Sequence, residues 1–162
     1  MKKKQITELL LFIVATELVG ALSALLTGKA FSFYQEIAKP PFSPPGWVFP
    51  VMWAILYAVM GISVFLIFRT DQNVENAGKP GKRSAYLLYT VQLAVNFSWS
   101  IVFFRFQMLG LSVVVILLLL VLLVAMIITF FKIRRSAAYL NIPYFLWILF
   151  ASYLNIGVLI LN

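Results

Sequence analysis

Long apolar runs separated by short polar connections dominate the chain. Five runs are long enough to cross a bilayer, because about 20 helical residues span the ~30 Å hydrocarbon core. They cover residues 6–26, 48–68, 84–104, 109–131 and 137–161. Backbone N–H and C=O groups must be paired inside hydrocarbon, so each run is expected to be an α-helix. The pattern predicts an all-α membrane protein, a bundle of five transmembrane helices forming one domain over residues 1–162.

The positions of Lys and Arg predict how the bundle is oriented. In a five-span arrangement ten basic residues fall on the side of the N-terminus and three, Lys29, Lys39 and Arg105, on the other. Cytoplasmic connections carry the excess of positive charge. The N-terminus is therefore predicted to be cytoplasmic and the C-terminus outside.

Composition narrows the chemistry that the protein can perform. The chain is 63% hydrophobic and 11% charged, with a mean hydropathy of +1.00, far from the values of soluble domains. It contains no Cys and no His, so no disulfide, thiolate nucleophile or imidazole ligand is available, and no metal site is predicted. The net charge of +8 resides in the connections, which argues for membrane orientation and against a nucleic-acid partner.

The first run has a second interpretation. A basic start followed by an apolar stretch is also typical of a cleavable signal peptide, with residues 21–24 as the small-residue region. Glu17 interrupts the stretch, and cleavage would remove the first span from the charge alternation, so we favour a permanent helix. Glu17 itself is either a proton-linked group or a hydrogen-bonded structural one.

The connection at residues 27–45 is predicted to be a lid or an interfacial anchor. It is longer than most helix connections and mixes aromatic residues with prolines. Aromatic side chains are common at membrane surfaces, and long loops often cover binding sites. A polar, glycine-containing segment at residues 70–81 is predicted to be a cytoplasmic loop.

Three spans carry stripes of aromatic and amide side chains at helical spacing. The second holds Trp53 and Tyr57, the third Gln92, Asn96 and Trp99, and the fifth Pro143, Trp147, Ala151 and Asn155. Facing one another, these stripes would enclose a flat aromatic pocket with a few amides. The alternative is that the indoles pack helices together and that the amides hydrogen-bond between helices. Trp47, near a span end, also fits an interfacial belt residue.

Three motifs in order, KPPFSPPGWVFPVMW with LYAVMG, NFSWSIVFF, and PYFLWILFASYLN, resemble the translocator protein family, also called tryptophan-rich sensory proteins or peripheral benzodiazepine receptors. The resemblance covers essentially the whole chain and implies a bacterial member in the plasma membrane. It implies a five-helix bundle that binds tetrapyrroles such as protoporphyrin IX, and synthetic isoquinoline ligands, with no required cofactor. Family members usually form homodimers.

The resemblance also implies which residues bind the ligand. They are Tyr34, Pro44, Trp47, Trp53, Tyr57, Asn96, Trp99, Trp147 and Ala151. A light-dependent breakdown of porphyrin, as linked to bacterial members, would use Trp53 and Trp147 as catalytic residues. The animal members' cholesterol motif needs a basic residue after its Tyr, and none follows Tyr153 here, so sterol recognition is not expected.

Three functions remain open from the sequence: a porphyrin-binding sensor or regulator, a photo-oxidative enzyme and a tetrapyrrole transporter. No internal repeat supports transport. Lys29 or Lys39 is the expected partner of the ligand's propionates. Small-residue pairs on the first span (Gly20 and Ala24) and on the third (Ala94 and Ser98) are alternative dimer faces.

Overall fold

The computed structural model describes residues 3–28, 30–71 and 81–162, so Lys29 and most of the predicted 70–81 loop lie outside the described residues. The described part consists of helices and short connections and contains no strand. Its elements are α1 (Lys3–Thr27), α2 (Ala30–Glu36), α3 (Val48–Phe68), α4 (Lys82–Ser100), the π-helical turn η2 (Ile101–Arg105), α5 (Leu109–Ile133), α6 (Arg135–Leu140) and α7 (Ile142–Leu161).

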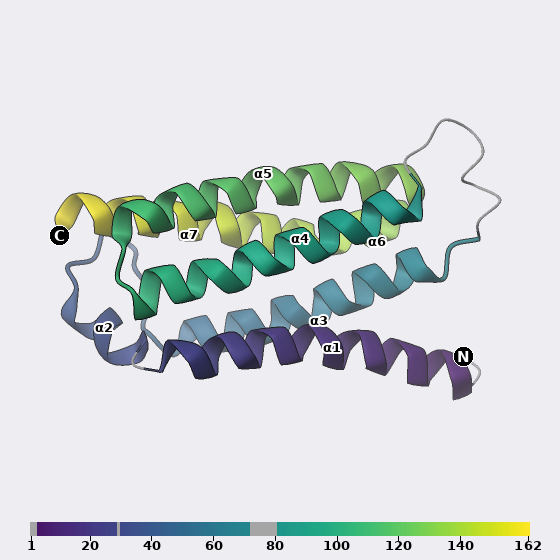
Figure 1. Ribbon diagram of the computed structural model, residues 1–162, viewed down its shortest axis with the longest axis horizontal. Coiled ribbons are helices and arrows are strands. Elements are labelled where there is room, and N and C mark those ends of the chain that lie inside the picture. The colour runs from purple at the N-terminus through teal and green to yellow at the C-terminus, as the bar shows by residue number, and fades with distance from the viewer. Residues whose placement is uncertain (1–2, 29, 72–80) are drawn as a thin grey trace.

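Five helical segments among the described residues are long and apolar enough to cross a membrane, in agreement with the predicted all-α, five-helix fold class. They are α1, α3, α4 with η2, α5, and α6 with α7. Figure 1 shows α1 beside α3 along one side of the bundle and α4, α5 and α7 along the other. The two chain ends lie at opposite ends of the bundle, and α2 lies at the same end as the C-terminus.

The outer surface of the bundle is apolar, as a lipid-facing surface must be. Leu25 on α1 is 77% exposed and Val121 on α5 is 66% exposed. Contacts between helices bury the other face of α5, including Ile116, Leu119 and Leu123. Such broad apolar exposure is unfavourable in water but matches hydrocarbon as the solvent.

Helices α1 and α3 approach each other closely at Gly61. A Cβ added there would lie 2.7 Å from the Ile13 Cα atom, so only glycine lets the two backbones meet at this point. Below this contact Phe12 packs on Phe65 and Phe68. The N-terminal half of α1 therefore packs against α3 without an open space between them.

The fifth span is divided rather than continuous. Asn141 separates α6 from α7, and its Nδ2 donates to the Ser63 Oγ at 2.6 Å and the Ala137 carbonyl at 2.9 Å. Pro143 stands in the first turn of α7, where its missing N–H costs little. The buried amide thus ties the break to α3 and restores hydrogen bonds that the break removes.

Candidate functional site

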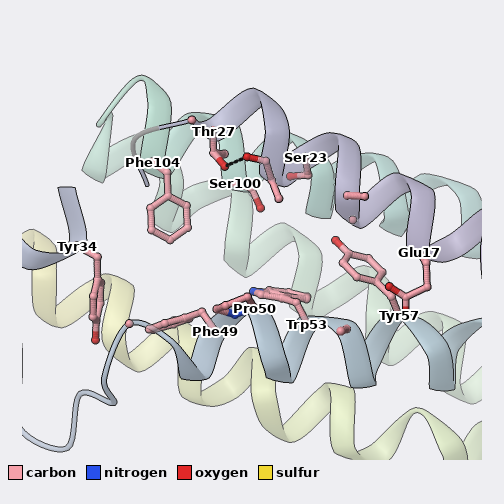
Figure 2. A pocket seen from close by; sticks show the side chains of 16 residues that line it. Glu17, Ser23, Thr27, Tyr34, Phe49, Pro50, Trp53, Tyr57, Ser100 and Phe104 are labelled. Carbon is pink, nitrogen blue, oxygen red and sulfur yellow. Dashed lines mark hydrogen bonds between the residues drawn. The ribbon is translucent and has the colours of Figure 1, made fainter. Parts of the chain in front are cut away.

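The main cavity lies between α1 and α3, at the end of the bundle where α2 is (Figure 2). Its volume is about 410 Å³. The lining residues come from α1, α2, α3, the end of α4, η2 and the connections before α2 and α3: Glu17, Gly20, Ala21, Ser23, Ala24, Thr27, Gly28, Tyr34, Gly46, Phe49, Pro50, Trp53, Ala54, Tyr57, Ser100 and Phe104. Because α1 and α3 run antiparallel, the cavity extends from Gly28 and Gly46 at its mouth to Glu17 and Tyr57 at its inner end.

The wall formed by α3 is flat and aromatic. Trp53 and Tyr57 are one turn apart on the helix, and their rings stack with centroids 5.5 Å apart and planes 30° from parallel. Phe49, a further turn toward the mouth, extends the same wall (Figure 2). A planar aromatic ligand can therefore lie along this side of the cavity.

The inner end is closed by contacts that depend on glycine. The Tyr57 ring lies directly against Gly20, where any added Cβ would collide with it. Beyond this point the Gly61 contact brings α1 and α3 together. The cavity therefore has a floor near the middle of the bundle and an opening near the loop that joins α1 to α3.

The wall formed by α1 carries the polar groups. Glu17 and Ser23 line the cavity, and the Ser23 Oγ is buried with no hydrogen-bond partner among the described residues. The Thr27 hydroxyl is already used, because it donates to the Ala24 carbonyl at 2.9 Å. The cavity thus combines one aromatic wall with one polar wall, the usual composition of small-molecule sites.

The mouth is covered by the segment that contains α2. The Tyr34 hydroxyl donates to the Pro44 carbonyl at 2.7 Å, and the Tyr34 ring packs edge-on against Phe49 at 4.9 Å. Burial raises the pKa of Tyr34 above its ordinary value. The predicted lid segment therefore contains a short helix, and a hydrogen bond joins this helix to the end of the segment that precedes α3.

The same segment is anchored on α7. The Tyr153 hydroxyl donates to the Pro41 carbonyl at 2.9 Å. The Asn162 side chain accepts from the Ala38 N–H and donates to the Ala38 carbonyl, each at 3.0 Å. Pro40 lies against Gly157, where an added Cβ would collide with the proline ring. The covering segment is thus held by the C-terminal half of α7 and by Asn162, which follows it.

Comparison with known proteins agrees with this architecture. Residues 12–161 match the family model for the TspO/MBR family. The chain belongs to the TspO/MBR family. The tryptophan-rich protein TspO of Chlorobaculum tepidum is 35% identical over 162 residues, 98% of each chain. The translocator protein of Bos taurus is 33% identical over 146 residues, 89% of this chain and 83% of the relative. The tryptophan-rich sensory protein of Cereibacter sphaeroides is 29% identical over 153 residues, 94% and 90% of the two chains. The predicted resemblance is confirmed, and this is an integral membrane protein.

In this TspO/MBR family member, three of the residues predicted to bind the ligand line the main cavity: Tyr34, Trp53 and Tyr57. Pro44 contributes its carbonyl to the bond with Tyr34. Trp47 is 63% exposed just before α3 and does not line the cavity, which is the position of an interfacial residue.

Trp99 and Ala151 lie elsewhere, beside a void of about 20 Å³ that shares Tyr34, Phe49 and Phe104 with the main cavity. That volume holds about one water molecule. The Trp99 Nε1 donates to the Asn155 Oδ1 at 2.8 Å, so this indole is part of a helix contact.

Asn96 and Trp147 lie in the packed core of the family member. The Asn96 Nδ2 donates to the Tyr144 hydroxyl at 3.0 Å, and that hydroxyl donates to the Gln92 Oε1 at 3.0 Å. Trp147 packs edge-on against Phe49 with centroids 5.9 Å apart, one ring away from the main cavity. The expected slot among the second, third and fifth spans is filled by these contacts, and the open space is between the first and second.

Sequence reasoning missed the contribution of α1. One face of α1 carries small residues at steps of three and four: Thr16, Gly20, Ser23 and Thr27. This pattern could have indicated that α1 lines a cavity. Gly20 and Ala24 were assigned to a possible dimer face, but both line the cavity. The stripe allows α1 to enclose space against the aromatic wall of α3.

Proposed function

We propose that this protein is a membrane-embedded binding protein for a flat tetrapyrrole such as protoporphyrin IX, and that it acts as a sensor or regulator of porphyrin or stress. The stacked Trp53–Tyr57 wall of the cavity is the observation that carries the proposal. Ligand cavities are usually roughly 300–1,000 Å³, and this one is about 410 Å³. Each aromatic contact with a macrocycle adds about 0.5–1.5 kcal/mol beyond the area buried. The wall also suits synthetic isoquinoline ligands.

The propionates of a porphyrin are proposed to lie at the mouth. The Lys39 Nζ already donates to the carbonyls of Tyr34 at 2.8 Å and Ile37 at 3.1 Å, so it serves the covering segment. Arg105 lies at the same end, where its Nη1 donates to the Leu26 carbonyl at 3.0 Å. Its remaining guanidinium donors make Arg105 a better partner for a carboxylate than Lys39. With no His or Cys in the chain, metal-free porphyrin is proposed to bind at least as well as haem.

A titration in the dark tests the proposal. Purified protein in detergent is mixed with protoporphyrin IX, and tryptophan fluorescence is followed. Saturable quenching at micromolar concentrations, about 8 kcal/mol of binding free energy, is expected. Quenching that rises linearly and equals that of free tryptophan in the same detergent would overturn the proposal.

A second candidate function is light-dependent oxidation of the bound porphyrin by dioxygen. Trp53 favours it, because this indole borders the cavity and lies 6.3 Å from the Trp99 ring, centroid to centroid. Illumination should then convert porphyrin to a new pigment faster than in protein-free detergent, and Trp53→Phe should abolish the difference. Trp147, which is shielded by Phe49, is proposed to matter less for this chemistry.

The proposal includes a homodimer in a bacterial plasma membrane. Ala94 and Ser98 are exposed on α4, whereas Gly20 and Ala24 are used by the cavity, so α4 is the proposed contact face. Ala94→Leu should shift the protein from dimer to monomer in light scattering of detergent-solubilised material. A dimer that is unaffected by this change would exclude the α4 face.

A further inference from the structure

A carboxyl group lies at the inner end of the cavity. Glu17 is ten residues from the end of α1 at Thr27, about 15 Å along the helix axis, which places it near the middle of the ~30 Å hydrocarbon core. Figure 2 shows Glu17 beside Tyr57, at the end of the cavity opposite Tyr34. A carboxyl group at this depth is costly without a partner, and such residues commonly mark a ligand pathway.

The protein supplies no cation for this carboxyl group within the cavity. Glu8, two and a half turns earlier on α1, forms an ion pair with Arg69, Oε2 to Nη1, at 3.4 Å. The described residues that line the cavity include no Lys and no Arg. Glu17 therefore presents acceptor oxygens to the cavity, whereas Glu8 is neutralised near the membrane surface.

Ser23 gives a second, independent observation. It is 3% exposed, its Oγ has no hydrogen-bond partner among the described residues, and it lines the same cavity. The other buried polar atoms without a partner, on Asn96, Asn141 and Trp147, belong to residues outside the cavity lining. An unpaired buried hydroxyl costs free energy that a bound polar group recovers. Ser23 lies six residues after Glu17, about 9 Å along α1.

We propose that Glu17 makes the inner end of the cavity a recognition site for a head group that donates hydrogen bonds through nitrogen, with a protonated amine as its best occupant, and that Ser23, about halfway to the mouth, offers a second polar contact to the ligand. The aromatic wall of Trp53 and Tyr57 holds the flat apolar body, and the polar wall of α1 selects the head group. This inference rests on the proposed function, since it concerns the same cavity. It narrows the ligand class and sets the ligand's direction in the site.

The direction follows from charge. A carboxylate of the ligand placed beside Glu17 would lie deep in the hydrocarbon core with no cationic partner, because no Lys or Arg of the described residues lines the cavity. Acidic groups are therefore directed to the mouth, where Arg105 lies. A porphyrin binds with its propionates outward, and an amphipathic amine binds with its nitrogen inward.

Three probes that share one aromatic body test the assignment. They are 1-pyrenemethylamine, 1-pyrenemethanol and 1-pyrenecarboxylic acid, and binding is followed by energy transfer from tryptophan to pyrene at neutral pH. Glu17→Gln keeps the shape of the side chain and removes its ability to form an ion pair with an ammonium group. It should weaken binding of the amine by about tenfold, change that of the alcohol by less than about twofold, and strengthen that of the acid.

Glu8→Gln is the matched control, because it makes the same change on the same helix outside the cavity. It should leave all three affinities unchanged. Each probe is compared with itself across variants, so differences in detergent partitioning cancel. Ser23→Ala should change all three affinities by less than about twofold, because a head group beside Glu17 lies about 9 Å from Ser23 along α1.

The outcomes separate the two proposals. Probes that bind the wild type with equal affinity whatever their head group, and equally well to Glu17→Gln, would overturn the head-group site while leaving the cavity as a ligand site. No saturable binding of any pyrene or of protoporphyrin IX would overturn the proposed function itself. Should Glu17→Gln not fold, the wild-type order of amine over alcohol over acid decides the question, and a preference for the acid overturns the assignment.

Discussion

Between α1 and α3, Trp53 and Tyr57 face open space, whereas between α4, α5 and α7 the same kinds of side chain pack against one another. There the Trp99 Nε1 donates to Asn155, and the Asn155 Nδ2 donates to the Ser112 Oγ at 2.8 Å. A polar aromatic side chain is available to a ligand only where its neighbours do not already fill or satisfy it. Residue type therefore does not separate a binding wall from a helix contact.

The two regions also differ in what lies opposite the aromatic side chains. Opposite α3, helix α1 offers Gly20, Ser23 and Ala24, which are small and leave volume empty. Opposite α4, helix α5 offers Leu119, Leu123 and Met126, which are fully buried and fill the interface. The small residues on α1 leave room for a ligand, whereas the large side chains on α5 stabilise the bundle by close packing.

The largest expected effect comes from filling the cavity. Gly20→Leu places a side chain where the Tyr57 ring and the ligand would lie, so protoporphyrin IX affinity should fall by about tenfold or more in the fluorescence titration. Gly110→Leu is the control, since a Cβ at Gly110 meets nothing within 4 Å. Equal affinities of the two variants would show that the ligand binds elsewhere.

Removing hydrogen bonds between α4, α5 and α7 should lower the stability of the protein and leave ligand affinity unchanged. Asn155→Ala removes the acceptor of Trp99 and the donor to Ser112, at about 2 kcal/mol for two buried bonds. Unfolding titrations with SDS measure the loss, and porphyrin affinity should stay within about twofold. Thr7→Ala, which removes an exposed bond to the Lys3 carbonyl, is the control and should have little effect. If Asn155→Ala lowered porphyrin affinity without lowering stability, the assignment of this region to helix packing would be wrong.

Replacing Trp53 or Trp147 tests whether the ligand lies against α3 or against α7. Trp53→Phe reduces the wall that the ligand contacts and should weaken porphyrin binding by about threefold, near 0.7 kcal/mol. Trp147→Phe, shielded behind Phe49, should leave affinity unchanged. Affinity that falls more for Trp147→Phe than for Trp53→Phe would move the ligand toward α7.

The smallest expected effect concerns the covering segment. Tyr153→Phe removes one partly exposed bond to the Pro41 carbonyl, so the rate of porphyrin dissociation should rise by about twofold. Stopped-flow displacement measures the rate. Tyr139→Phe, an exposed tyrosine in α6, should leave the rate as it is in the wild type. Identical rates in both variants would show that the bond to Pro41 does not hold the mouth closed.

The helices and the family could be predicted from the sequence because both signals are local. Each span had to be an apolar helix of sufficient length, and each motif could be recognised as a short run of residues. The stripe on α3 could also be predicted, since helical spacing alone places Trp53 and Tyr57 on one face.

The position of the cavity was decided by tertiary contacts. It depends on Gly61 meeting Ile13, on Tyr57 meeting Gly20 and on Asn155 meeting Trp99, pairs that lie far apart in the chain. Hydropathy and spacing tell which residues share a helix face, but not which face of a neighbouring helix they meet, because the lipid is equally apolar on every side. The chain by itself therefore determined five membrane-spanning helices, while the close approach of particular pairs decided which aromatic residues line open space and which are packed away.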